Sequence, residues 1–311
     1  MKKIILLAVI STSVVGMMQS CKKDTPTGAS SATLNVVKKQ RSLLIYNAST
    51  FSQDCGASSN AVFSTAIAAN STDNLIALNL QPITNPYLSP LTPIYYNSVK
   101  DSLVIAPFNT QLYSQTKPTG TLPQFYLSNS SLGTVTVSAT DIANYTAQYN
   151  SSATVEIGVA ANASLSGNKF TVNYKMQAFE PEAGAQYYTT VLLVEKGISS
   201  FQVGATNNKM DQKNIIRASM QYDANNFQTA FAVSDIKSNK DAILNKTVTF
   251  DYVPVSQKWI TAVNANYQTL TGNDFGWWTL NKSNTAAVVV VWKYISPTEL
   301  FYINSVWADV K

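Results

Sequence analysis

A regular alternation of apolar and polar residues runs through the second half of this 311-residue chain and limits that half to β-structure. In the stretch "KFTVNYKMQA" (169–178), the large apolar side chains fall on every second residue, which places them on one face of a strand. Seven further stretches have the composition of strands: "TVEIGV", "YYTTVLLVE", "NIIRASM", "FQTAFAV", "KTVTFDYVPV", "AAVVVVWKY" and "ELFYINSVWADV". Many short strands separated by loops predict an all-β, immunoglobulin-like sandwich over residues 151–311.

The first half of the chain combines strands with helices. "SLLIYN" (Ser42–Asn47) and "LIALNLQ" (Leu75–Gln81) are predicted strands, and Ser58–Asn70 between them carries apolar residues at helical spacing. This order forms a βαβ unit, which requires a parallel strand pair with a right-handed crossover. "GTLPQFYLSN", which contains Pro123, and "TVTVS" are further strands, and "ATDIANYTAQYN" is a last helix. With a cysteine before the first helix, the order predicts an α/β, thioredoxin-like domain over residues 34–150.

The N-terminus has the pattern of a bacterial lipoprotein signal peptide. Two lysines precede an apolar stretch from Ile4 to Met18, and Ser20 lies directly before Cys21. The apolar stretch is too short for a stable transmembrane helix. We therefore expect residues 1–20 to be a cleaved lipoprotein signal peptide and Cys21 to carry the lipid. The alternative is an ordinary signal peptide followed by an accidental cysteine.

The lipid anchor predicts an outer membrane location. A bacterial lipoprotein carries three acyl chains, palmitate among them, and stable anchoring needs at least two chains. The sequence "CKKD" lacks the aspartate directly after the cysteine that retains lipoproteins in the inner membrane. Residues 21–33 continue with the polar, small-residue sequence "KKDTPTGASSAT", and we expect them to be a flexible tether.

The composition excludes several classes of function. The chain has no histidine, which removes the commonest general base, the Ser-His-Asp and Cys-His arrangements and the commonest metal ligand. We expect neither a metal nor a cofactor. Charged residues make up only 13% of the sequence, and "KKQR" (38–41) is the only dense basic group, so nucleic acid is not an expected partner.

Cys55 is the candidate redox residue. Once Cys21 carries lipid, Cys55 is the free thiol of the mature chain, so no intrachain disulfide can form. It precedes a helix, where amide donors and the helix dipole stabilise a thiolate. Ser58 stands where a second cysteine would lie, and Asp54 opposes ionisation of the thiol. Three interpretations stay open: an inert packing residue, occasional mixed-disulfide or dimer chemistry, and a specific thiol function in which a cis Pro123 shapes the substrate site.

With both halves in view, the chain resembles the Bacteroidetes outer membrane lipoproteins that are named after a 28-kilodalton outer membrane protein. The matching stretches are "LLIYNASTFSQDCGASSNAVFSTAIA", "LPQFYLSN", "YYTTVLLVEKGI" with Glu195, "NIIRASM" with Arg217, and "AAVVVVWKYISPTELFYINSVWADV". The resemblance implies a lipidated cysteine, a thioredoxin-like domain and a β-sandwich domain. The chain departs from the family pattern at Ser58, where other members often carry a second cysteine, and at Asn214, where a histidine is frequent.

Three weaker candidates concern glycans, modification and acid–base chemistry. Trp277 and Trp278 in "GNDFGWWTLN" could stack on sugar rings, or else pack in and beside the sandwich. Ser102 lies in "DSL", a pattern of O-glycosylation in exported proteins of this bacterial group. Glu180 and Glu182 in "FEPEAG" form a carboxylate pair, but the loop composition favours a solvated turn over acid/base catalysis.

The favoured hypothesis is a non-catalytic outer membrane lipoprotein that acts as a binding or structural module of the cell envelope. An enzyme is not expected, and the expected partners are the membrane, through the lipid anchor, and an envelope protein or glycan. One alternative is a monothiol thiol-disulfide partner that uses Cys55, and burial of Cys55 would count against it. The other is a glycan-binding surface lipoprotein, which requires Trp277 and Trp278 side by side in a groove.

Overall fold

The computed structural model describes residues 34–50, 52–81, 94–97, 102–105, 112, 116, 122–133, 137–152, 154–219, 232–233, 236, 239–251, 280–296 and 299–311. The strands are β1 Ser42–Asn47, β2 Leu75–Leu80, β3 Ile94–Asn97, β4 Ser102–Ile105, β5 Gln124–Leu127, β6 Ser130–Gly133, β7 Ile157–Ser166, β8 Lys169–Ala178, β9 Tyr187–Phe201, β10 Lys209–Ser219, β11 Ala232–Val233, β12 Ile243–Asp251, β13 Thr285–Ser296 and β14 Glu299–Asp309. The helices are α1 Asn60–Ala69, α3 Ala139–Ser152, a π-helical segment Cys55–Ser59, and single 3-10 turns at Thr206–Asn208 and Lys282–Asn284.

The predicted strand–helix–strand unit is present. β1 and β2 pair in parallel, from Ser42 opposite Leu75 to Asn47 opposite Leu80, with α1 between them in the sequence. β5 pairs antiparallel with β1, and β6 pairs antiparallel with β5. The prediction of this unit is confirmed, because an apolar run, a helical repeat and a second apolar run each form the element that their period favours.

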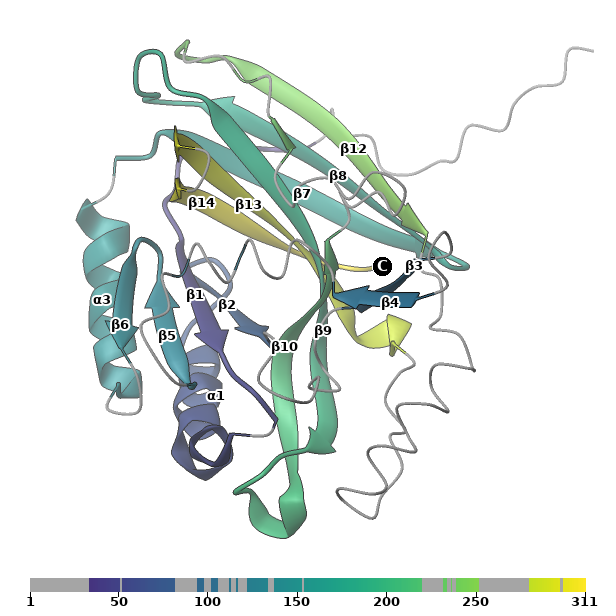
Figure 1. Cartoon of the computed structure of the whole chain (residues 1–311). Helices are drawn as coiled ribbons and strands as arrows, with labels where there is room; N and C mark the ends of the chain where they lie inside the picture. Colours follow the sequence, from purple (N-terminus) through teal and green to yellow (C-terminus); the bar gives the residue numbers. More distant parts are fainter. Residues whose placement is uncertain are drawn as a thin grey trace, which may run out of the picture.

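A single large sheet joins the two halves of the chain. Its strand order is β14-β13-β9-β10-β2-β1-β5-β6, and β11 pairs with β9 beside that path (Figure 1). β10 pairs in parallel with β2 at Ile215 and Asn79. The expected division near residue 150 into a thioredoxin-like domain and an immunoglobulin-like sandwich is therefore not confirmed. The fold is β-rich, and its mixed sheet crosses the expected boundary. In a separate first half, β2 would be an exposed sheet edge, and pairing with β10 covers that edge.

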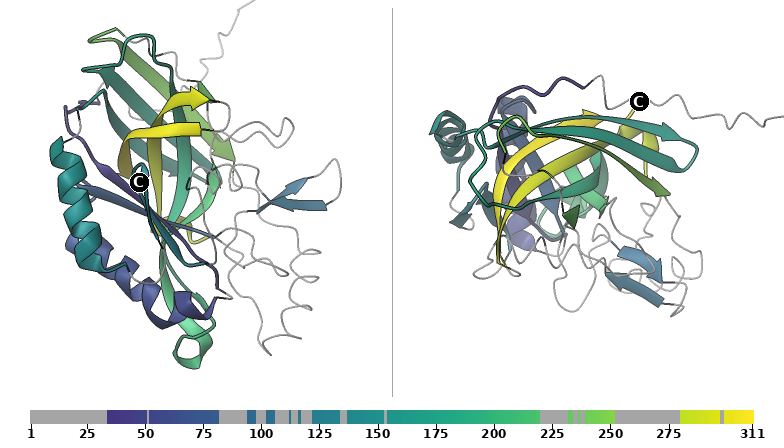
Figure 2. Two further views of the ribbon diagram at one scale, coloured as in Figure 1. Left: turned by 60° about the vertical axis from the view of Figure 1, so that its left-hand side comes forward. Right: turned by 90° about the horizontal axis from the view of Figure 1, so that it is seen from above.

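Three strands in the order β12-β8-β7 form a second sheet that packs against the β9, β13 and β14 end of the large sheet (Figure 2). The four residues predicted to share one face of 169–178 are all buried in the core between the two sheets: Phe170, Val172, Tyr174 and Met176. The period-two prediction is thus confirmed for this strand. The chain end joins the small sheet, since Lys311 N–H donates to Ala163 O (3.2 Å) and Leu165 N–H donates to Lys311 O (3.1 Å).

The helices and the small sheet cover the same face of the large sheet at different ends. Directly opposed residues of paired strands share a face, and Ile215 is opposed by both Glu195 and Asn79. Along β9, Glu195 shares its face with Leu193, which lies in the core under the small sheet. Along β2, Asn79 shares its face with Ala77, which lies in the core under the helices.

The opposite face of the large sheet is also apolar. It is formed by side chains of β1, β2, β9, β10, β13 and β14, most of them fully buried, such as Leu43, Ile76, Leu192 and Val288. No helix within the described ranges is long and apolar enough to cross a lipid bilayer.

Candidate functional site

Cys55 lies where the sequence places the candidate redox residue, at the start of the π-helical segment that leads into α1. Its side chain is only 1% exposed and belongs to the core that includes Tyr46 and Phe63. Ser58, the residue in the position of a second cysteine, is exposed. The two side chains therefore do not share a solvent-accessible site.

Pro123 lies close to the cysteine loop, which we define as residues 48–55. The Leu122–Pro123 peptide bond is cis, as the thioredoxin-like interpretation expects, and Pro123 is buried directly before β5. Ser52 Oγ donates a hydrogen bond to Leu122 O (3.1 Å), so the loop and the proline turn are in contact.

The surroundings of Cys55 favour the neutral thiol. Burial raises the pKa of Cys55, hydrogen bonds from Ser52 and Ser49 and the Tyr46 hydroxyl partly oppose this, and the Asp54 carboxylate adds to the rise. The Ser49 N–H donates to Cys55 Sγ at 3.5 Å. The thiol is therefore protonated at neutral pH, and a protonated thiol is neither a nucleophile nor a metal ligand.

The turn between β9 and β10 closes over the cysteine loop. We call residues 202–205 the covering turn, and it lies beside the start of α1 at the lower end of the molecule (Figure 1). Val203 N–H donates to Thr50 O (2.9 Å). A Cβ atom at Gly56 would lie 2.1 Å from Val203 O, so the two backbones touch at a point where only glycine fits. A segment from the second half of the chain therefore packs against the loop and the helix start that hold the thiol.

A chain of buried amide side chains connects the covering turn to the large sheet. Gln202 Nε2 donates to Ser49 O (3.1 Å) and Ser52 O (2.9 Å), and Gln212 Nε2 donates to Gln202 Oε1 (2.9 Å). Asn79 Nδ2 then donates to Gln212 Oε1 (3.2 Å). The three amide side chains are at most 1% exposed. A buried network whose hydrogen bonds are satisfied favours one arrangement of the elements that it joins, because breaking the network would leave buried polar groups without hydrogen-bond partners.

Glu195 and Arg217, which lie in two of the stretches that carry the family resemblance, form a buried ion pair. Arg217 Nε lies 3.5 Å from Glu195 Oε2, and their side chains are 12% and 1% exposed. The Asn281 N–H donates to the other carboxylate oxygen of Glu195 (3.1 Å). Burial raises the pKa of Glu195, and the charge of Arg217 and the Asn281 hydrogen bond oppose that rise.

Asn214 lies at about the position where the resembled lipoproteins often carry a histidine, and here it links the two halves of the chain. Its φ of 49° lies in the left-handed region, which asparagine tolerates better than most residues. Its Nδ2 donates to Ala77 O (2.9 Å) and so adds a side-chain link between β10 and β2.

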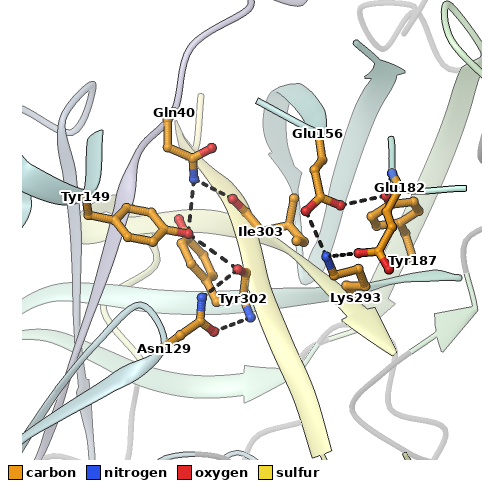
Figure 3. Close-up of polar contacts among 9 residues, drawn as sticks. All are labelled: Gln40, Asn129, Tyr149, Glu156, Glu182, Tyr187, Lys293, Tyr302 and Ile303. Atoms are coloured by element: carbon orange, nitrogen blue, oxygen red, sulfur yellow. Dashed lines mark hydrogen bonds and ion pairs between the residues drawn. The ribbon is translucent and has the colours of Figure 1, made fainter. Parts of the chain in front are cut away.

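Lys293 lies between two carboxylates at the end of β13 (Figure 3). Its Nζ is 2.8 Å from Glu156 Oε1 and 2.7 Å from Glu182 Oε2, and it lies 5.4 Å from the Phe301 ring centroid. Tyr187 OH donates to Glu156 Oε2 (2.7 Å). Burial alone would lower the pKa of Lys293, but the two carboxylates outweigh burial and the pKa is raised. Lys293 is thus fully paired by two carboxylates of the protein itself, and we interpret the cluster as a structural contact that joins β13 to the segments that carry Glu156 and Glu182.

The predicted carboxylate pair of Glu180 and Glu182 does not act as a unit. Glu182 binds Lys293, whereas Glu180 binds Lys38 of the N-terminal segment. The Glu182 side chain is 64% exposed and the Glu180 side chain is 50% exposed, which agrees with a solvated turn. The arrangement therefore offers no acid/base pair.

A second polar cluster fixes the N-terminal segment to β14 (Figure 3). Asn129 exchanges two hydrogen bonds with the backbone of Tyr302, accepting from its N–H (2.7 Å) and donating to its carbonyl (3.0 Å). Gln40 Nε2 donates to Tyr149 OH (3.4 Å) and to Ile303 O. These side chains form hydrogen bonds with backbone groups of the edge strand β14, which leaves fewer of those groups free to pair with a strand of another chain.

Four predicted site residues are not tested by this geometry. Cys21, Trp277 and Trp278 lie outside the described residues, and Ser102 begins β4 in a part where the side chains are not described. The lipidation, glycan and glycosylation predictions therefore stay predictions. Within the described ranges, no group of three or more cysteine or carboxylate side chains could hold a metal ion.

The fold places this chain among β-rich proteins that are built around a large mixed sheet. Its free cysteine, Cys55, is buried. No family model matches the chain, and no curated protein matches it. The structure is similar to that of HBP35 of Porphyromonas gingivalis, with a TM-score of 0.59 and 9% identity over 88% of this chain and 76% of that chain. This likeness shows a shared fold.

Two further solved structures are less similar. One is the Agrobacterium tumefaciens protein AGR_C_4864, with a TM-score of 0.45 and 8% identity over 88% of this chain and 94% of that chain. The other is a domain of the outer membrane lipoprotein Omp28 from Porphyromonas gingivalis, with a TM-score of 0.26 and 14% identity over 50% of this chain and 89% of that domain. The structural neighbours from Porphyromonas gingivalis thus include an outer membrane lipoprotein domain.

Proposed function

We propose that this protein is a lipid-anchored outer membrane lipoprotein whose folded part is a non-catalytic binding or structural module of the cell envelope. The N-terminal pattern that ends in Ser20 and Cys21 supports the anchor. The fold shared with a Porphyromonas gingivalis protein agrees with the sequence resemblance to Bacteroidetes outer membrane lipoproteins.

The non-catalytic part of the proposal rests on one observation: the Cys55 thiol in the cysteine loop is inaccessible to solvent. The strand order β6-β5-β1-β2, with α1 and α3 on one face and a cis Pro123, supports a thioredoxin-like arrangement of these elements. A thiol in such an arrangement must reach a disulfide as a thiolate to react. Cys55 is 1% exposed, its pKa is raised by burial, and the covering turn lies over its loop. We therefore assign the loop a structural task.

The rate at which Cys55 reacts with a thiol reagent across pH tests this assignment. The experiment uses the full mature chain, with Cys55→Ala as the control for reaction elsewhere. We expect negligible labelling of the folded protein at every pH at which it stays folded, and rapid labelling once it is unfolded. Fast native labelling with an apparent pKa below the free value of about 8.5 would overturn the assignment and favour the monothiol alternative.

Lipid attachment is tested at Cys21. The wild-type chain should lose residues 1–20, gain the mass of the acyl chains and fractionate with the outer membrane. Cys21→Ala should lack the added mass and leave the membrane fraction, because one residue carries the whole anchor. A wild-type protein without lipid, or a variant that stays in the outer membrane fraction, would contradict the proposed anchor.

A further inference from the structure

The outward face of the small sheet is polar and regular. Side chains alternate between the two faces of a strand, and on β8 the residues between the core positions point outward. Across the three strands, Asn173 Nδ2 donates to Asn162 Oδ1 (3.1 Å) and Thr247 Oγ1 donates to Asn173 Oδ1 (2.7 Å). Lys169 and Lys175 also lie at outward-facing positions of β8. We call this surface the polar face.

The N-terminal segment crosses one end of the polar face. Gly158 points outward, because Ile157 and Val159 on either side of it are in the core. A Cβ atom at Gly158 would lie 2.8 Å from Val36 Cγ1 and 3.1 Å from Val37 O, so the segment lies directly on the sheet. Figure 2, right, shows the start of the described chain, in purple, beside the small sheet on the side away from the large sheet.

Two exposed apolar side chains lie on this side of the molecule. Gly158 is opposed by Gln177, and Gln177 is opposed by Ile243, so these three residues form one row across the sheet. Ile243 is 54% exposed and Val37, beside the same row, is 53% exposed. Exposed apolar residues next to lysines and neutral hydrogen-bonding groups match a lipid headgroup layer, which offers phosphates above and acyl chains below.

The length of the tether limits which side of the protein can face the membrane. Twelve residues, 22–33, separate Cys21 from Leu34. Such a chain reaches about 45 Å at full extension and about 20 Å on average as a flexible coil. A compact chain of this size has a radius of gyration of about 19 Å, hence a diameter of about 50 Å. An average tether therefore holds the side from which it leaves near the bilayer and does not reach around the molecule.

We infer that the polar face of the small sheet is the membrane-facing surface of the protein, where its exposed lysine and hydroxyl groups contact phosphate-bearing lipid headgroups. The inference rests on the proposed lipid anchor at Cys21. The charges on this side leave a small positive excess: Lys169, Lys175 and Lys240 are accompanied by Asp241 and by Asp251, which the register places opposite Lys169, while Glu180 is bound by Lys38. The covering turn and the cysteine loop then lie away from the membrane.

Energy transfer from two labelled positions tests the orientation. Thr249→Cys lies on the polar face, and Thr206→Cys lies in the turn between β9 and β10; both threonines are exposed. Each full-length, lipidated variant carries a donor dye in vesicles of phosphatidylethanolamine and phosphatidylglycerol whose headgroups carry an acceptor dye. Wild-type protein, with Cys21 lipidated and Cys55 buried, gives the background labelling. We expect a large loss of donor fluorescence at residue 249 and a small loss at residue 206.

The outcomes separate the orientation from the anchor on which it rests. Mass spectrometry of the same samples reports whether Cys21 carries lipid. An equal loss at both positions, or a larger loss at residue 206, in lipidated protein overturns the orientation alone. Absence of lipid on Cys21 overturns the proposed anchor, and the orientation falls with it.

Discussion

Burial of the Cys55 thiol makes the stability of the fold sensitive to alkaline pH. The pKa of Cys55 is raised above the free-thiol value of about 8.5, mainly by burial. Above that pH the unfolded chain loses the proton while the folded chain keeps it, so the free energy of unfolding has its full value below about pH 8.5 and falls above it. Cys55→Ala should cost about 1 kcal/mol at neutral pH, through lost packing, and should lessen the alkaline decline. Urea unfolding at neutral and alkaline pH measures both.

Buried tyrosines set the control for that experiment. The pKa values of Tyr46 and Tyr302 are also raised by burial, so part of the decline at the highest pH persists in the variant. The comparison is therefore made between pH 8 and pH 10, where the thiol titrates first. Equal declines in wild type and Cys55→Ala over this interval would contradict the burial of the thiol.

Asn214 is the residue at which the backbone itself selects the side chain. Asn214→Val should lower the free energy of unfolding by about 2–4 kcal/mol, because it adds left-handed strain and removes the hydrogen bond to Ala77 O. Asn214→Gly relieves the strain and loses only the hydrogen bond, so its cost should be about 1 kcal/mol. Urea unfolding ranks the three proteins. Equal losses in the two variants would show that the backbone conformation does not matter.

At the scale of elements, we expect the contact between the covering turn and the π-helical segment to limit access to the thiol. Gly56→Ala places a Cβ atom 2.1 Å from Val203 O, so the turn must move away. We expect the variant to be less stable and its native-state labelling of Cys55 to be faster than in wild type. Gly197→Ala is the matched control, since its Cβ would meet nothing closer than 3.8 Å. Labelling of the Gly56→Ala thiol as slow as in the control would show that the turn is not the cover.

The local periodicity of apolar residues predicts individual helices and strands. It does not predict contacts between residues that are far apart in the sequence. β1, α1, β2 and β8 follow from apolar spacing, and the cis bond before Pro123 is the isomer that the thioredoxin-like interpretation expects. The covering turn does not, because Gln202 and Ser49 are 153 residues apart. The signal that could have pointed to the amide chain is Asn79 inside the apolar strand "LIALNL", since a buried amide requires partners.

At the scale of the whole molecule, the large sheet makes the two halves interdependent. Residues 34–152 alone would expose the β2 edge that β10 covers and the Asn79 amide that binds Gln212. We expect this fragment to lack a cooperative thermal transition, because the exposed edge and the unpaired buried amides both oppose folding. Circular dichroism on heating measures this, with the full chain as the control. A sharp transition in the fragment would support an independent first domain.

The expected domain boundary near residue 150 followed from a change in the spacing of apolar residues, from mixed helical and strand spacing to a period of two. The structure does change near that residue from strands and helices to strands. What periodicity cannot show is which strands pair, because the spacing of apolar residues indicates which face of a strand is buried and does not identify its neighbour in the sheet. The pairing is decided by the amide chain and by Asn214, whose partners belong to the other half. A change of period therefore marks a change of local architecture, and the large sheet continues across it.

The denaturant dependence of Cys55 labelling tests most directly the claim that one continuous fold keeps this thiol closed. Labelling after a short pulse of thiol reagent is compared with tryptophan fluorescence over the same urea series. The account predicts coincident transitions, because the cover over the thiol comes from the second half of the chain and is lost only when the common sheet unfolds. Complete labelling at urea concentrations at which the fluorescence is still native would contradict it.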